Sequence, residues 1–273
     1  ILTGVQTRGS VNKLKALSTD TAALEQTLLK ADSGTLDSLF NSLANDQEFQ
    51  HNIFQQHPFV IKSPLPSVKS CFTMDDVKDA VDNDFLDAGR GTYAQGKGGW
   101  NMLPVSEPRG SSFQDAKMRF SDVQAAMAEK SGTVVFNSAG AYIPKVALIN
   151  LMFVNAFEMP AATNMYLTAA GQATSAPPHC DKQDVFVLQS QGYKRWRVFA
   201  PPPPSRMPRA DPFQRGKSTD ALELAELDEP LIDVVLEPGQ LLYVPAGFPH
   251  TTDTVHNIDI DSTPSVHLTI GLD

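Results

Sequence analysis

Cysteine is scarce in this chain, which has only Cys71 and Cys180 among its 273 residues. Two widely separated cysteines do not make the dense disulfide framework of a small secreted domain. Long apolar runs are also missing, because Asn150 and Asn155 interrupt the best candidate, residues 146–157. We therefore expect neither a disulfide scaffold nor a membrane-spanning segment.

An excess of positive charge is absent as well. The chain has 22 Lys and Arg residues against 31 Asp and Glu residues, a formal net charge of −9. A general binder of the nucleic-acid backbone would be basic, so we expect no general DNA binding, although a local basic patch is compatible with this charge. Arg206, Arg209, Arg215 and Lys217 lie in one polar segment, which is either a solvated loop or a docking surface for an acidic ligand.

Helical patterns dominate the first half of the chain. Apolar residues recur at helical spacing in residues 33–45, and Thr73 is suited to cap a helix with an acidic first turn. Pro144 fits the first turn of a later helix whose apolar positions surround it, so we expect that helix to be buried. The predicted helices are residues 21–30, 33–45, 46–57, one from residue 73, 120–130 and 144–158.

Strand patterns dominate the second half, and the fold class that results is mainly β with α. We expect a double-stranded β-helix, or jelly roll, with helices packed on its outside and at its N-terminal end. Residues 1–130 would form a helical and irregular N-terminal region, and residues 131–273 the barrel. The predicted strands are residues 59–61, 133–136, 163–168, 185–188, 193–199, 232–236, 241–244 and 265–270.

A metal-binding pattern lies within the predicted barrel. His179 and Asp181 are separated by one residue, so in an extended strand their side chains point to the same face. A third candidate, His250, follows a Pro238-Gly239 turn and a short apolar strand. Two histidines and one carboxylate make the facial triad of non-haem Fe(II) oxygenases, which leaves coordination positions open.

The other residues that could bind a metal fit less well. Cys180 lies between the first two ligands and should point away from the metal. Asp184 has an odd spacing from His179, so we expect it to face away, as a surface acid or one that supports the ligands from outside. Structural or solvated roles are expected for the remaining histidines that we considered, namely His51, His57 and His256.

Residues 185–199 predict a β-hairpin with a turn at Gln191-Gly192. On the second strand Lys194 alternates with Trp196, so both should face inward, whereas Arg195 falls on the other face. A dianionic ligand in a closed barrel needs a cation, because a buried and unpaired carboxylate is unfavourable. Lys194 is therefore preferred to Arg195 as its binding residue.

Taken together, these segments resemble the JmjC group of 2-oxoglutarate oxygenases, and within it the ribosomal oxygenases. The resemblance covers about the last 140 residues, with a weaker match at residues 49–62 and 132–157. The segments that carry it are Asn164-Met-Tyr-Leu-Thr168, Pro177-Pro-His-Cys-Asp181, Phe186-Val-Leu-Gln189, Gly192-Tyr-Lys-Arg-Trp-Arg-Val198, Leu236-Glu-Pro-Gly-Gln-Leu-Leu-Tyr243 and Ser265-Val-His-Leu-Thr269.

The resemblance implies a set of ligands and roles. It places Fe(II) on His179, Asp181 and His250, with 2-oxoglutarate and O2 as the other reactants. It places the C5 carboxylate of 2-oxoglutarate on Lys194 and gives Tyr166 a hydrogen bond to the same co-substrate. Asn164, Ser265 and His267 alternate into the barrel and are further candidates for contacts with the cofactor or substrate, although His267 could equally be a core histidine.

The implied activity is hydroxylation of a protein side chain, with a ribosomal or translation-associated protein as the partner. Three alternatives stay open: an N-methyl-lysine demethylase, a non-enzymatic cupin-like binding module, and a metal-dependent cupin enzyme without a co-substrate. The family's helical dimerisation region and winged-helix domain would follow the last strand, but the chain ends at Asp273. The chain is therefore either a fragment or lacks those parts, which leaves its oligomeric state open. The residues do not determine the compartment; the resemblance alone suggests a nuclear or nucleolar one.

Overall fold

The computed structural model describes residues 21–83, 100–103, 119–128, 133–201, 222–255 and 262–272. The predicted basic segment with Arg206, Arg209, Arg215 and Lys217, and also His256, lie outside these residues. The helices are α2 Thr21–Ala31, α3 Leu36–Ala44, α4 Met74–Asp82, α5 Phe120–Ala128 and α6 Pro144–Phe157, with a π-helical turn at Phe49–Ile53 and 3-10 turns at Ala139–Ala141 and Leu224–Glu226. The strands are β1 Phe59–Ile61, β2 Trp100–Leu103, β3 Thr133–Phe136, β4 Ala161–Thr168, β5 Ala176–His179, β6 Asp184–Gln191, β7 Lys194–Val198, β8 Ile232–Leu236, β9 Leu241–Val244, β10 His250–Asp253 and β11 Ser265–Leu272.

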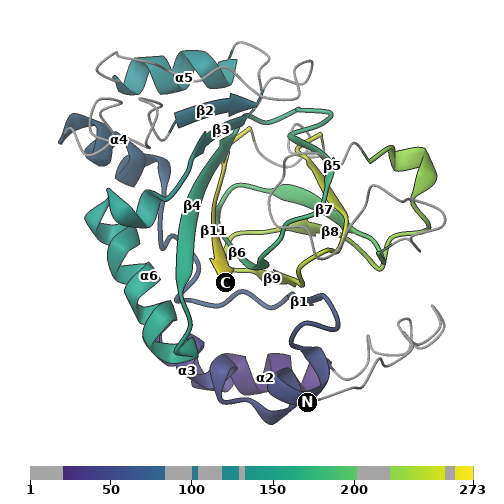
Figure 1. Cartoon of the computed structure of the whole chain (residues 1–273). Helices are drawn as coiled ribbons and strands as arrows, with labels where there is room; N and C mark the ends of the chain where they lie inside the picture. The colour runs from purple at the N-terminus through teal and green to yellow at the C-terminus, as the bar shows by residue number, and fades with distance from the viewer. Residues whose placement is uncertain are drawn as a thin grey trace.

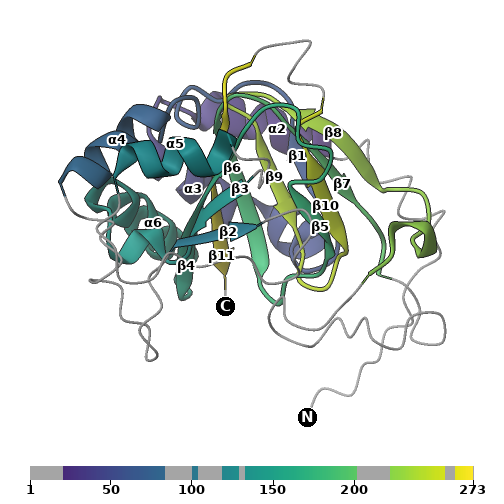
Figure 2. The same cartoon turned by 90° about the horizontal axis from the view of Figure 1, so that it is seen from above.

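Two antiparallel sheets form the barrel, as the predicted double-stranded β-helix requires. The larger sheet has the strand order β1-β9-β6-β11-β4-β3-β2, and the smaller has the order β5-β10-β7-β8. Seen from above, α4, α5 and α6 lie on one side of the larger sheet and the smaller sheet lies on its other side (Figure 2). The N-terminal part of the chain supplies the two edge strands of the larger sheet, β1 and β2, as well as helices.

The predicted hairpin at residues 185–199 is wrong. β6 pairs with β9 and β11 in the larger sheet, whereas β7 pairs with β8 and β10 in the smaller one. The turn at Gly192 is therefore a corner between sheets. Gly192 has a φ of +62°, and a Cβ there would lie 2.5 Å from the carbonyl oxygen of Pro264, so the corner requires glycine.

α4 and α6 begin where Thr73 and Pro144 predicted, whereas the helix predicted from residue 33 begins at Leu36. Thr73 and Asp76 form a reciprocal capping box at the start of α4, and Thr35 caps α3 by accepting a hydrogen bond from the amide of Ser38. Pro144 occupies the first turn of α6. α6 runs along β4 on the side of the larger sheet that faces away from the smaller one, and α2 and α3 lie below β1 (Figure 1).

The prediction that α6 is buried on all sides is wrong. Its buried residues Val146, Ile149 and Phe153 face the core, but Leu148 is 58% exposed and Leu151 is 53% exposed. Only one side of α6 therefore meets the apolar core. None of the helices in the described residues has the length and apolar composition needed to span a bilayer.

Candidate active site

A strand pair and a loop bring the three predicted ligands together. β5 ends at His179 and β10 begins at His250, and these two residues are direct partners in the antiparallel pairing of the strands. Asp181 follows two residues later, and its backbone carbonyl accepts a hydrogen bond of 2.9 Å from the amide of Gly247. That bond joins the loop after β5 to the turn before β10, so backbone interactions fix the positions of all three residues.

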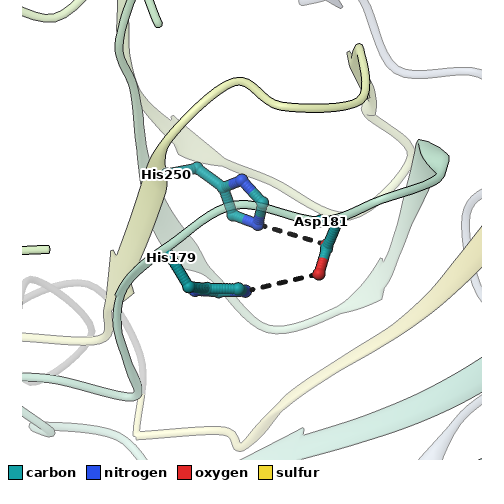
Figure 3. Close-up of side chains that lie close together, drawn as sticks. All are labelled: His179, Asp181 and His250. Carbon is teal, nitrogen blue, oxygen red and sulfur yellow. Dashed lines mark ion pairs between the residues drawn. The ribbon is translucent and has the colours of Figure 1, made fainter. Parts of the chain in front are cut away.

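The three side chains converge on one point (Figure 3). Nε2 of His179 lies 3.7 Å from Oδ1 of Asp181, and Nε2 of His250 lies 3.4 Å from Oδ2 of Asp181. One ligand atom from each residue can be chosen so that all lie within 4.8 Å of one another. A single metal ion can bridge donor atoms at this spacing.

The histidine hydrogen bonds fit a metal site. Nδ1 of His179 lies 2.8 Å from the carbonyl oxygen of Pro177, and Nδ1 of His250 lies 3.0 Å from that of Phe248. A carbonyl only accepts, so each Nδ1 carries the proton and each Nε2 keeps a lone pair directed at the centre. Metal-ligating histidines are oriented in this way, and two histidines with one carboxylate suit Fe(II).

A cavity adjoins the ligands and is lined by both sheets. The larger sheet contributes Tyr166 from β4 and His267 and Thr269 from β11, and the smaller contributes Lys194 and Trp196 from β7 and Thr252 from β10. The cavity therefore runs between the two sheets next to the candidate metal centre.

Lys194 supplies a buried positive charge to this cavity. It is 1% exposed, and its ammonium donates a hydrogen bond of 2.9 Å to the hydroxyl of Thr168, which lies 3.0 Å from that of Thr133. Arg195 lies on the opposite face, where its guanidinium forms a bidentate pair with Asp233. The predicted register of β7 is therefore confirmed, although the strand pairs differently from the prediction.

The remaining predicted site residues divide into two groups. Tyr166 and His267 are both buried and line the cavity, and their rings stack with centroids 4.8 Å apart and an interplanar angle of 4°. Asn164 accepts a hydrogen bond of 2.8 Å from the amide of Ser138, and Ser265 accepts one of 3.0 Å from Nε2 of Gln189. The last two side chains thus hold neighbouring segments and do not line the cavity.

Asp184 lies outside the three-residue cluster, but it is not a surface acid as its spacing suggested. It is buried on the face of β6 that carries Phe186, and its Oδ1 accepts a hydrogen bond of 2.6 Å from the hydroxyl of Tyr243. Burial raises the pKa of the Asp184 carboxyl, and this bond partly opposes the shift. Asp184 thus belongs to the contact between barrel and helices.

The other predictions for candidate ligands agree with the structure. Cys180 is buried in a small apolar cluster with Leu222. His51 is exposed and contacts its own helical turn, and His57 is half-buried in a groove separate from the active-site cavity. Burial lowers the pKa of His57.

Sequence reasoning assigned no role to Thr168 or Thr252. Thr168 lies two residues after Tyr166 in β4, so both side chains are on the same face of the strand. Its inward orientation could therefore have been predicted from the alternation of side chains along a strand. Thr252 lies on the same face of β10 as His250, but the strand pairing that sets it opposite Trp196 is visible only in the folded chain.

Comparison with known proteins identifies the domain. A family model described as "JmjC domain" matches residues 138–273. Rat ribosomal oxygenase 2 is 26% identical over 86% of this chain and 47% of its own length. The bifunctional lysine-specific demethylase and histidyl-hydroxylase NO66 of Aedes aegypti is 36% identical over 42% of this chain and 17% of its own length.

Solved structures give the same fold. The Escherichia coli ribosomal oxygenase YcfD, solved in complex with cobalt and 2-oxoglutarate, aligns with a TM-score of 0.52 and 16% identity over 84% of this chain and 51% of that chain. The chain spans about half or less of the length of the curated relatives that it matches. Residues 138–273 are a JmjC domain, and through this domain the chain belongs to the JmjC family.

Proposed function

We propose that this protein is an Fe(II)- and 2-oxoglutarate-dependent oxygenase that hydroxylates a protein side chain. The observation that carries the proposal is the shared cavity, which combines a two-histidine, one-carboxylate cluster with the buried ammonium of Lys194. A metal-binding module without a co-substrate would have no need of a buried cation. The structural neighbour YcfD was solved with cobalt and 2-oxoglutarate, which supports the same pair of ligands.

Different residues would bind the metal and the co-substrate. His179, Asp181 and His250 hold Fe(II), while Lys194 and Tyr166 hold the distal carboxylate of 2-oxoglutarate. When bound, iron and 2-oxoglutarate supply the O2-dependent oxidation of a C–H bond, with succinate and CO2 as co-products.

Asn164, Ser265 and His267 complete the proposed site in supporting roles. Asn164 and Ser265 fix the backbone and side chains around the cavity through the hydrogen bonds given above. His267 holds the ring of Tyr166 by stacking. These contacts would set where the tyrosine hydroxyl meets the co-substrate.

The substrate that we propose is a side chain of a ribosomal or other translation-associated protein. The names of the relatives support this class, since most of those compared are ribosomal oxygenases. The acidic chain, with a net charge of −9, is also suited to a basic protein partner. Lysine demethylation is the second candidate, and the name of NO66 includes both activities.

The test is to incubate the protein with Fe(II), 2-oxoglutarate and a set of ribosomal-protein peptides. Mass spectrometry should detect the addition of one oxygen atom to a peptide, together with peptide-dependent succinate. Formaldehyde release from a methyl-lysine peptide would instead favour the demethylase. His179→Ala is the matched control, and a failure of the native chain to form succinate with any peptide or bind 2-oxoglutarate would reject the oxygenase.

A further inference from the structure

Trp196 has a buried hydrogen-bond donor that no described residue accepts. The residue is 5% exposed, and its indole Nε1 has no hydrogen-bond partner among the residues that the structure describes. Buried tryptophan N–H groups usually have a partner, because burying an unpaired donor is unfavourable. A residue that lines a cavity and carries an unpaired donor is therefore a candidate for contact with a ligand.

The position of Trp196 places its ring between the metal-ligand cluster and Lys194. On β7 it lies two residues after Lys194, and its partner on β10 is Thr252, two residues beyond His250. Its ring lies 5.8 Å from that of His250 and 5.6 Å from that of His267. A ligand that reaches from the metal centre to Lys194 must therefore pass Trp196.

The chemistry of the donor restricts the ligand. An indole N–H only donates, so its partner must be an acceptor. The buried charge of Lys194 favours an anion in the same cavity. The indole does not titrate, so it offers its donor at any pH at which the protein is folded.

We infer that Trp196 is a further co-substrate-binding residue, and that its Nε1–H donates a hydrogen bond to a carboxylate oxygen of the 2-oxoacid. This inference rests on the proposed function. The indole would then act together with Lys194, each donating to an anionic group of one ligand. The stacking of Trp196 on His250 would couple co-substrate binding to the position of a metal ligand.

The first experiment is the substitution Trp196→Phe, which keeps an aromatic ring and removes the N–H. Calorimetry on the Mn(II)-loaded chain should show 2-oxoglutarate binding weakened by about tenfold or more, because the lost bond is to a charged acceptor. Mn(II) affinity should stay unchanged, and the unfolding midpoint of the metal-free protein should be equal or higher, since an unpaired buried donor has been removed. Trp100→Phe, which changes the other tryptophan of the chain, is the control and should bind 2-oxoglutarate as the native chain does.

A second measurement does not depend on the stability of that variant. The chain has two tryptophans, so a 15N-labelled sample gives two indole N–H resonances, and Trp100→Phe assigns them. In the Zn(II)-loaded protein, addition of 2-oxoglutarate should shift the Trp196 resonance downfield and slow its exchange with solvent. A resonance that stays in place at saturating 2-oxoglutarate would overturn the inference.

The outcomes separate this inference from the proposed function. If the metal-loaded native chain binds no 2-oxoglutarate, the oxygenase proposal fails and this inference fails with it. If the native chain and Trp196→Phe bind 2-oxoglutarate equally well, Trp196 is a packing residue only and the oxygenase proposal stands. Selective weakening in Trp196→Phe, with native metal affinity, supports the assignment.

Discussion

The two faces of β11 are equally buried and chemically opposite. All eight residues from Ser265 to Leu272 are buried. Val266, Leu268, Ile270 and Leu272 belong to the apolar core beneath the helices, whereas His267 and Thr269 line the active-site cavity. Burial by itself therefore does not distinguish a core position from a site position; the chemistry of the buried face does.

The two faces also differ in the interactions that stabilise them. The outer face meets an aromatic cluster in which Phe153 packs against Phe157 and Phe186 with ring centroids 4.3 Å and 5.0 Å away. Apolar burial and dispersion contacts stabilise this face without any ligand. The inner face adjoins the cavity, where Lys194, His250 and Trp196 of the smaller sheet are buried. The indole Nε1 of Trp196 has no hydrogen-bond partner among the described residues, and burying such polar and charged groups is unfavourable unless they are paired. Substitutions should therefore affect stability on the outer face and ligand binding on the inner face.

The largest expected effect is on the inner face, at the metal ligands. His179→Ala and His250→Ala should each abolish Fe(II) binding and succinate formation, because three protein ligands leave none to spare. Circular dichroism should show that both variants stay folded. Full succinate production by either variant would remove the three-residue cluster from the mechanism.

Phe153→Ala tests the outer face. Removing this fully buried ring should reduce the free energy of unfolding by about 3–5 kcal/mol, through lost transfer energy and the cavity that remains. Urea denaturation measures the change, and Mn(II) affinity of the folded protein should be native. Leu148→Ala, on the exposed side of the same helix, is the control and should change stability by less than about 0.5 kcal/mol. Loss of metal binding in folded Phe153→Ala would contradict the expectation that the outer face affects stability and not ligand binding.

Lys194→Ala and Arg195→Ala compare two neighbours on opposite faces of β7. Lys194→Ala should weaken 2-oxoglutarate binding by roughly ten- to hundred-fold, the equivalent of a charge-assisted hydrogen bond of about 1.5–3 kcal/mol. Arg195→Ala should have little effect, since its partner is the half-exposed Asp233. Titration of 2-oxoglutarate into the Mn(II)-loaded variants measures both, and the reverse order would contradict the register of the strand.

Asp184→Asn tests the smallest effect, a buried acid on the outer face. Because burial raises the pKa of Asp184, the folded state holds a proton on this residue more tightly than the unfolded state does. The stability that this proton contributes is present below the ordinary carboxyl pKa and is lost as the pH rises through the raised pKa. The native chain should therefore lose stability relative to Asp184→Asn over that pH range, as measured by urea denaturation at a series of pH values. A difference that does not change with pH would show that folding does not shift the pKa of Asp184.

The sequence predicted more of the site than of its surroundings. The H-x-D spacing and the alternation in residues 193–199 are local patterns, and they correctly oriented His179, Asp181 and Lys194. The same reading paired β6 with β7, because neighbouring strands joined by a short turn usually form a hairpin. It also read Asp184 as a surface acid or one that supports the ligands from outside, since a lone carboxylate gives no local sign of a buried partner as distant as Tyr243.

The sequence by itself determined which residues face the same way along each strand and, at Thr73 and Pro144, where a helix begins. Side-chain alternation and these helix-start signals depend only on near neighbours. The tertiary structure decided which strands pair, which brings His250 opposite His179 and sets Trp196 between the metal ligands and Lys194. It also decided that only one side of α6 is covered. These outcomes depend on contacts between segments far apart in the chain, and no local pattern encodes their free energy.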